Sequence, residues 1–159
     1  GVEYHASAVG EVHVVEKMKA VNAVVGGEGN GGIILPKLHY GRDALVGIAL
    51  FLSFLAKEDE TVSNLKKRYS NYVMAKKKIQ LSEAWDTDAL LLAVADTFKN
   101  ERVTTIDGVK IDFDDSWIHL RKSNTEPIIR LYAEAQNNQR IQAQVEKIET
   151  AIAAFVASA

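Results

Sequence analysis

The sequence contains no cysteine, and this absence excludes several kinds of chemistry at once. Without thiols there can be no disulfide, no thiolate nucleophile and no cysteine-based metal site, and the lack of cysteine fits a reducing compartment. No apolar run approaches the roughly 20 residues that a membrane span needs, and no segment resembles a signal peptide. We therefore expect a soluble, cytoplasmic protein with no membrane partner.

The chain also lacks an excess of positive charge. Its 19 Lys and Arg residues are outnumbered by 21 Asp and Glu residues, which gives a formal net charge of −2. Broad binding to nucleic acid or to a membrane surface needs a basic field. Single-stranded nucleic-acid binding further needs stacked aromatic residues, and these are only 8% of the chain. We therefore expect no nucleic-acid partner, and we interpret the basic runs at residues 66–68 and 76–78 as solvated faces.

What the sequence does contain is the composition of an ordinary globular protein, with 47% hydrophobic and 25% charged residues. A length of 159 residues allows one ordinary domain or two small ones. The charged segment 57–60 separates two patterned regions and is the predicted linker. The chain starts at Gly1 and not at Met, so we expect a piece of a longer protein.

The first region, residues 1–57, predicts short strands and a helix. Residues 9–18 have a mixed strand and helix character, and residues 20–25 and 33–35 predict buried strands on either side of a glycine-rich loop. Residues 43–56 predict a helix, because apolar residues recur there at helical spacing. The members of this stripe are Ala44, Leu45, Ile48, Phe51, Leu52 and Leu55.

The second region, residues 61–159, predicts an α+β domain with an antiparallel sheet and helices packed on one face. Asp107-Gly108 predicts a hairpin with a type I′ turn, because these residues tolerate positive φ angles. Asn137 or Asn138 is the expected N-cap of the last helix. The remaining expected elements are a helix at 61–69 capped by Thr61 or Ser63, a strand at 72–81, a helix at 86–99, and strands at 117–120 and 128–135.

The glycine-rich loop at residues 26–32 is the first candidate site. Five glycines let the backbone bend freely and approach a ligand closely. A carboxylate accepts hydrogen bonds, so Glu28 suits a ligand rich in hydroxyls such as a sugar, and Asn30 adds a donor and an acceptor. The order of glycines fits neither a dinucleotide fingerprint nor a P-loop. A flexible turn with an exposed Glu28 is the alternative, and spacing alone leaves both open.

The second candidate site is the segment R-K-S-N-T-E-P-I-I-R at residues 121–130. Its hydroxyls, amide and consecutive backbone N–H groups can form an anion-binding concavity. Arg121 and Arg130 can each give bidentate hydrogen bonds to a phosphate. The predicted phosphate-binding residues are Arg121, Ser123, Asn124, Thr125 and Arg130. The alternative is a surface hairpin whose arginines pair with Glu126 and Glu134.

No metal site or catalytic residue is predicted in this chain. The four histidines, at positions 5, 13, 39 and 119, share no metal-ligand spacing. The acidic run at 112–115 is interpreted as a solvated turn, since no further ligands lie beside it.

Both loops together resemble one family, the α-D-phosphohexomutases. Residues 26–31, G-G-E-G-N-G, resemble the sugar-binding G-G-E-x-S-G loop, and residues 121–130 resemble the phosphate-binding R-x-S-G-T-E-P-x-x-R loop. Val9-Gly10-Glu11 and Gly41-Arg42-Asp43 add to the resemblance. Three positions depart from the pattern: Asn30 replaces the usual Ser, Gly32 a common His, and Asn124 a Gly.

The resemblance implies a substrate-binding part of a larger enzyme. Residues 1–57 would be the end of the third, α/β domain, truncated here, and residues 61–159 the complete fourth domain. The family shifts a phosphate between the 1- and 6-positions of a hexose phosphate through a bisphosphorylated sugar. The phosphoserine and the Mg²⁺-binding loop belong to earlier domains of the parent chain, which would be this chain's partners. We therefore expect the chain alone to be inactive, with a non-catalytic sugar-phosphate-binding module as the alternative.

Overall fold

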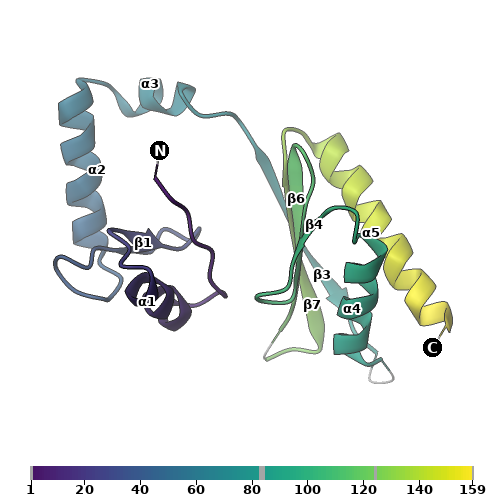
Figure 1. The fold of residues 1–159 in the computed structure, drawn as a ribbon. Helices are drawn as coiled ribbons and strands as arrows, with labels where there is room; N and C mark the ends of the chain where they lie inside the picture. Colours follow the sequence, from purple (N-terminus) through teal and green to yellow (C-terminus); the bar gives the residue numbers. More distant parts are fainter. Residues whose placement is uncertain (1, 83–84, 124, 159) are drawn as a thin grey trace. The chain divides into compact units, whose positions relative to one another are not determined.

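The structure is a computed structural model that describes residues 2–82, 85–123 and 125–158. The chain divides into two compact units, Gly1–Tyr69 and Ser70–Ala159 (Figure 1). Within the described ranges, no helix is long and apolar enough to cross a membrane.

The first unit has a small core beneath a two-stranded hairpin. Its elements are α1 (Glu11–Ala20), β1 (Gly26–Gly27), β2 (Ile33–Ile34), α2 (Ala44–Glu58) and α3 (Val62–Lys67). β1 and β2 pair antiparallel, and Val14 and Met18 of α1 are buried with Ile34 of β2. Strand β1 contacts α1, so this core supports the start of the glycine-rich loop.

The predicted strand at residues 20–25 is wrong. Helix α1 continues to Ala20, and Asn22 then adopts a left-handed conformation with φ 51°, so the backbone turns here instead of extending. Val24 and Val25 are exposed, and the pairing starts only at Gly26. A run of apolar residues does not make a strand unless a neighbouring strand pairs with it, and pairing is not visible in a short run.

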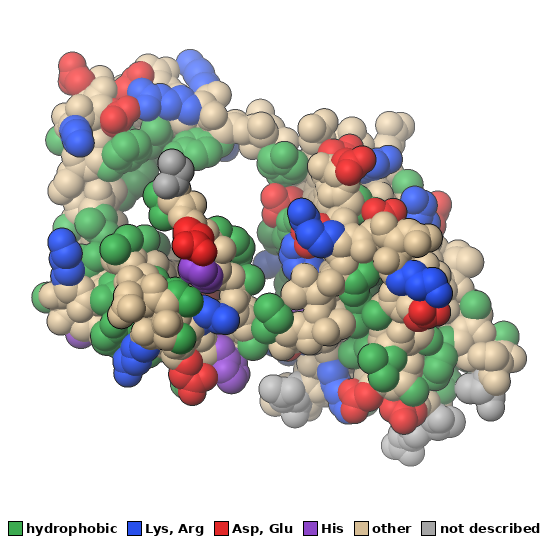
Figure 2. All heavy atoms as spheres, in the orientation of Figure 1, with side chains coloured by type: hydrophobic (Ala, Val, Ile, Leu, Met, Phe, Trp, Pro, Cys, Tyr) green, Lys and Arg blue, Asp and Glu red, His purple; other side chains and the backbone are tan. Residues whose placement is uncertain are grey.

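Helix α2 confirms the prediction for residues 43–56, but its apolar stripe is not buried. Asp43 is the N-cap, and its Oδ1 accepts a hydrogen bond from the Val46 backbone N–H at 3.0 Å. Leu45 is 78% exposed and Leu52 57% exposed. Periodicity therefore predicted the helix correctly, while no described residue covers most of the stripe. Figure 2 shows hydrophobic side chains at the surface of the first unit.

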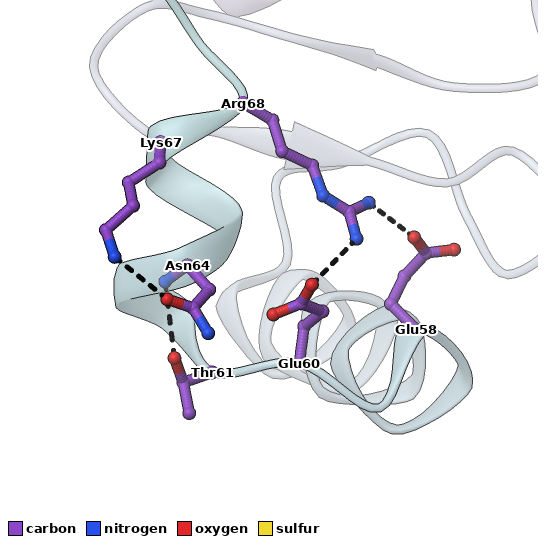
Figure 3. A network of polar contacts seen from close by, with 6 residues as sticks. All are labelled: Glu58, Glu60, Thr61, Asn64, Lys67 and Arg68. Atoms are coloured by element: carbon purple, nitrogen blue, oxygen red, sulfur yellow. Dashed lines mark hydrogen bonds and ion pairs between the residues drawn. The ribbon is translucent and has the colours of Figure 1, made fainter.

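The residues predicted as a linker, 57–60, are tied to the next helix (Figure 3). Lys57 and Glu58 still belong to α2. Arg68 Nη1 contacts Glu58 Oε2 at 2.5 Å, and its Nη2 contacts Glu60 Oε1 at 3.2 Å. Thr61 caps α3 as predicted, since its Oγ1 accepts from the Asn64 backbone N–H at 3.2 Å. The boundary between the two compact units falls later, after Tyr69.

The second unit is a five-stranded antiparallel sheet with two helices on one face (Figure 1). The strand order is β3-β7-β6-β5-β4. The elements are β3 (Val73–Gln80), α4 (Thr87–Thr97), β4 (Arg102–Thr104), β5 (Val109–Asp112), β6 (Ser116–Lys122), β7 (Ile128–Ala135) and α5 (Asn138–Ser158). This architecture confirms the predicted α+β fold, and Asn137 caps α5, its Oδ1 accepting from the Arg140 backbone N–H at 2.9 Å.

The core of the second unit lies between the sheet and the helices. Alternate residues of each strand point to this core, as the period of an extended chain requires. Its fully buried large side chains include Leu90, Val94, Ile111, Ile118, Leu120, Ile129, Leu131, Val145 and Ile148. The intervening residues of β6 and β7 therefore lie on the face that α4 and α5 leave uncovered.

The hairpin predicted at Asp107-Gly108 forms between β4 and β5, but the predicted turn type is wrong. The last pair in the register is Thr104 with Lys110, so the connection is longer than a two-residue turn. Gly108 has φ 67°, whereas Asp107 is not in the positive-φ region that a type I′ turn requires of both central residues. A Cβ at Gly108 would overlap the backbone oxygen of Leu120, so close packing against β6 also demands glycine here.

Candidate functional site

The loop predicted to bind phosphate connects β6 to β7 in the second unit. Ser123 follows β6 directly, is buried, and donates its backbone N–H to the Ile128 oxygen at 2.9 Å. Arg121 and Arg130 are register partners on neighbouring strands, so both lie on the helix-free face at the loop end of the sheet. The structure therefore brings together Arg121, Ser123, Thr125 and Arg130, and Asn124 lies outside the described residues.

Each arginine has a carboxylate counter-ion. Arg121 Nη1 contacts Asp107 Oδ2 at 3.3 Å, and Arg130 Nη2 contacts Glu126 Oε2 at 3.4 Å. The alternative arrangement expected Glu126 and Glu134 as partners. Glu126 does pair with Arg130, whereas the partner found for Arg121 is Asp107, which comes from the β4–β5 connection.

The hydrogen bonds that the Ser123 side chain accepts inside this loop are long. Ser123 Oγ accepts from Arg130 Nη2 and from the Thr125 backbone N–H, both at 3.5 Å. The buried Nε of Arg130 has no partner among the described residues. Charge-assisted bonds to a phosphate are normally about 2.7–2.9 Å. These donors are therefore only loosely satisfied by the protein itself, which is the state expected of an anion site.

Lys78 is a residue of this site that sequence reasoning missed. In the register of the sheet, Lys78 of β3 pairs with Arg130 of β7, which pairs with Arg121 of β6, so three cations form one row on one face. Lys78 Nζ contacts Glu126 Oε1 at 3.0 Å. The hydrogen bond from Lys78, and to a lesser degree the charge of Arg130, lower the pKa of Glu126 below its ordinary value. The basic run 76–78 was the available signal, but the pairing of β3 with β7 is not visible in the sequence.

A shallow pocket of about 210 Å³ opens beside the loop. Its lining includes Thr87, Lys122, Ser123, Glu126 and Pro127. Pockets that enclose a drug-sized ligand are typically about 300–1,000 Å³. Neither Arg121 nor Arg130 lines this pocket, so it lies beside the loop and does not enclose the arginine pair.

The glycine-rich loop of the first unit is a tight turn between β1 and β2. The Glu28 backbone N–H donates to the Gly32 oxygen, and the Gly31 N–H donates to the Glu28 oxygen, both at 3.0 Å. Gly31 has φ 97°, and a Cβ on Gly27 would overlap the Gly32 oxygen. These two glycines are thus required by the turn itself.

Glu28 and Asn30 occupy different environments in this loop. The side chain of Glu28 is only 14% exposed, so the alternative of an exposed Glu28 on a flexible turn does not hold. Asn30 Oδ1 accepts a hydrogen bond from the Gly32 backbone N–H at 3.1 Å. The acceptor of Asn30 is therefore used within the loop, and its amide nitrogen is the atom better placed to meet a ligand.

Glu11 and Arg42 support this loop, and neither was predicted as a site residue. Arg42 gives Glu11 two hydrogen bonds, from its backbone N–H at 3.1 Å and from Nε at 2.9 Å. These bonds lower the pKa of Glu11. Arg42 Nη1 lies 3.9 Å from Glu28 Oε2, and its Cδ passes 2.8 Å from where a Gly32 Cβ would be. Glycine at position 32 thus leaves room for Arg42 beside Glu28.

The described residues contain no group of three or more His, Cys, Asp or Glu side chains that could hold a metal ion.

Comparison with known proteins assigns the family. The family model described as "Phosphoglucomutase/phosphomannomutase, alpha/beta/alpha domain III" matches residues 1–72, and the model of the C-terminal domain of the same family matches residues 57–151. The chain belongs to the phosphoglucomutase/phosphomannomutase family. Both loops of the sites above lie within the matched residues, so the family resemblance stated from the sequence is confirmed.

Individual members of the phosphoglucomutase/phosphomannomutase family agree with this assignment. A phosphoglucosamine/phosphogalactosamine mutase of Sulfurisphaera tokodaii is 37% identical over 81% of this chain and 29% of its own length. A phosphoglucomutase/phosphomannomutase of Thermococcus kodakarensis is 33% identical over 92% of this chain and 32% of its own length. A solved family protein of Burkholderia thailandensis has a TM-score of 0.74 at 25% identity, over 93% of this chain and 32% of its own. The chain thus spans about a third of the length of these relatives.

Proposed function

We propose that this chain is the substrate-binding C-terminal portion of a phosphohexomutase. The parent enzyme would interconvert hexose 1-phosphate and hexose 6-phosphate through a bisphosphorylated sugar, and phosphomannomutase or phosphoglucosamine mutase is the favoured activity. The observation that carries the proposal is the pair Arg121 and Arg130, directly opposite each other beside a buried Ser123, in a member of this family. The names of the relatives support the same substrate class.

The β6–β7 loop would hold the phosphate that is not reacting. Two guanidinium groups on adjacent strands can each offer a planar pair of donors to a phosphate. The residues with this role are Arg121, Ser123, Asn124, Thr125 and Arg130. They would position the substrate without making or breaking bonds, and positioning lowers a barrier by reducing its entropic part.

The glycine-rich loop would bind the sugar hydroxyls. Glu28 supplies a carboxylate acceptor and Asn30 an amide donor, so a hydroxyl can act as donor to one residue and acceptor from the other. Such a pair can grip a hexose in either of the two orientations that the reaction requires. Arg42, whose Nη1 lies 3.9 Å from Glu28 Oε2, would help to orient this carboxylate.

The remaining parts of the site would come from the parent chain. In this proposal residues 1–57 belong to the third domain of the family and residues 61–159 to the fourth. The parent, a cytoplasmic enzyme, would supply the phosphoserine and the ligands of Mg²⁺, which assists phosphoryl transfer when bound. This chain alone would then bind hexose phosphate without turning it over.

Two assays test the proposal. Calorimetry of the purified chain with mannose 6-phosphate should give saturable binding, and a coupled mutase assay of the same chain with hexose 1-phosphate should give no turnover. Turnover by this chain would contradict its assignment as a binding portion. If the parent protein also has no mutase activity while phosphosugar binding persists, the alternative of a non-catalytic sugar-phosphate-binding module is correct.

A further inference from the structure

Glu126 is held between two cations that belong to the same row of the sheet. Its Oε1 lies 3.0 Å from Lys78 Nζ, and its Oε2 lies 3.4 Å from Arg130 Nη2. Lys78 and Arg130 are register partners on β3 and β7, so the carboxylate bridges two adjacent strands. The contact to Lys78 is the shorter one, and the contact to Arg130 is the one that is more easily given up.

The bond to Glu126 uses a donor that a phosphate would need. Arg130 Nη2 is shared between Glu126 Oε2 and Ser123 Oγ at 3.4 and 3.5 Å. Both bonds are long for a charged donor, and the Nε of Arg130 is buried without a partner among the described residues. The Arg130 guanidinium therefore binds weak acceptors of the protein itself with donors that could bind a phosphate more strongly.

A counter-ion is needed in the unliganded protein because the two arginines repel each other. Arg121 and Arg130 are direct register partners, and like charges opposite each other destabilise a sheet. Asp107 compensates Arg121, and Glu126 compensates Arg130. A phosphate dianion placed between the arginines would take over this compensation, and the Glu126 carboxylate would then have to leave Arg130.

We propose that Glu126 is a built-in competitor for the anion that Arg130 binds, and that Lys78 holds the displaced carboxylate when the anion is bound. The inference rests on the phosphate site of the proposed function and adds two residues with distinct tasks. Without a ligand, Glu126 neutralises the charge of Arg130 and holds its side chain in position. Lys78 already contacts the other carboxylate oxygen, so the exchange requires Glu126 to give up one bond and keep one.

The first test compares the affinity of inorganic phosphate for the wild-type chain and for Glu126→Gln, by NMR titration at pH 7.5. Removing a competitor should tighten binding, by about two- to fivefold for an exposed ion pair. The matched control is Glu149→Gln, which removes the same charge from a carboxylate that pairs with Lys77 at 3.4 Å on the helix side. Glu149→Gln should leave the affinity within experimental error of the wild type.

The outcomes separate the inference from the site on which it rests. If the wild type binds phosphate and Glu126→Gln binds it equally or more weakly, Glu126 is not a competitor, while the phosphate site stands. If only Glu126→Gln binds phosphate, the role of Glu126 as a competitor is supported, and Glu126 blocks the wild-type site at these phosphate concentrations. If neither protein binds phosphate, the site and the inference both fail. An equal gain in Glu149→Gln would attribute the effect to net charge and overturn the inference.

The second test isolates Lys78. Lys78→Met should weaken phosphate binding about two- to fivefold in the wild-type background, because Glu126 then has only Arg130 as a partner. In the Glu126→Gln background, Lys78→Met should have a smaller effect. The change in the logarithm of the phosphate affinity should be less than half of the change in the wild-type background. An equal loss in both backgrounds would show that Lys78 binds phosphate directly, and would overturn its assignment as the holder of Glu126.

Discussion

Replacement of Arg130 by alanine should sharply weaken hexose-phosphate binding. Arg130 lies on the helix-free face, and its side-chain hydrogen bonds to described residues are the long ones to Glu126 and Ser123. The substitution therefore removes little from the folded protein, and the main loss is a charged, bidentate contact to the ligand. Hydrogen bonds to charged groups are worth about 1.5–3 kcal/mol, which corresponds to a 10- to 150-fold loss of affinity.

A matched control exists on the same sheet. Arg102 of β4 also lies on the helix-free face, pairs with Asp112 at 3.6 Å, and is 78% exposed. Arg102→Ala removes the same formal charge, but from β4, which is the edge strand on the opposite side of the sheet from β3 and β7. At physiological salt, exposed charges beyond about 8 Å are largely screened. Arg102→Ala should therefore change the affinity less than twofold.

Calorimetry with mannose 6-phosphate measures these affinities directly. A third variant, Arg130→Lys, separates the effect of charge from the effect of the guanidinium geometry. Lysine keeps the positive charge but loses the planar fork, so its affinity should fall between those of the wild type and Arg130→Ala. Thermal unfolding of each variant checks that the fold is retained. Equal affinities for Arg130→Ala and Arg102→Ala would refute the reasoning, because the effect of Arg130 would then be one of net charge alone.

Three further predictions concern stability. Gly108→Ala should lower the free energy of unfolding by about 1–3 kcal/mol in chemical denaturation, because the site has φ 67° and a Cβ would overlap the Leu120 oxygen; an unchanged value would contradict the close packing. Ile129→Ala, at a fully buried position, should cost about 2–5 kcal/mol in the same assay, and a cost below 1 kcal/mol would place Ile129 outside the core. Glu11→Gln should be less stable than the wild type above pH 4.5, the ordinary pKa of this group, because bonds from Arg42 lower its pKa in the folded protein. That difference should vanish as the pH falls through the lowered pKa, and a difference that persists at pH 2 would exclude the ion pair as its cause.

The features that the sequence predicted well, in both units, are those whose signals are local. In an extended segment 128–135, Arg130 lies on the opposite face from Ile129 and Leu131, and the structure buries these two residues while Arg130 lies on the helix-free face. The capping side chains of Asp43, Thr61 and Asn137 act within three residues of their helix starts. Such features depend on neighbouring residues only, so a pattern in the chain is enough to predict them.

The features that the sequence did not predict depend on distant residues. Lys78 joins the arginine row only because β3 pairs with β7, some 50 residues later in the chain. Arg42 reaches Glu11 across 31 positions, so the support of the glycine-rich loop was also missed. The stripe of α2 shows a different limit, since periodicity predicts which face of a helix is apolar but not what covers it.

Binding of the phosphate of a hexose phosphate by the β6–β7 loop underlies the proposed function. The most direct measurement is an NMR titration of the ¹⁵N-labelled chain with mannose 6-phosphate, following the backbone amides. We expect saturable shifts of the Ser123 and Thr125 amides and of the guanidinium signals of Arg121 and Arg130. Saturable binding that leaves these four residues unshifted, or no binding at millimolar ligand, would contradict this role of the loop.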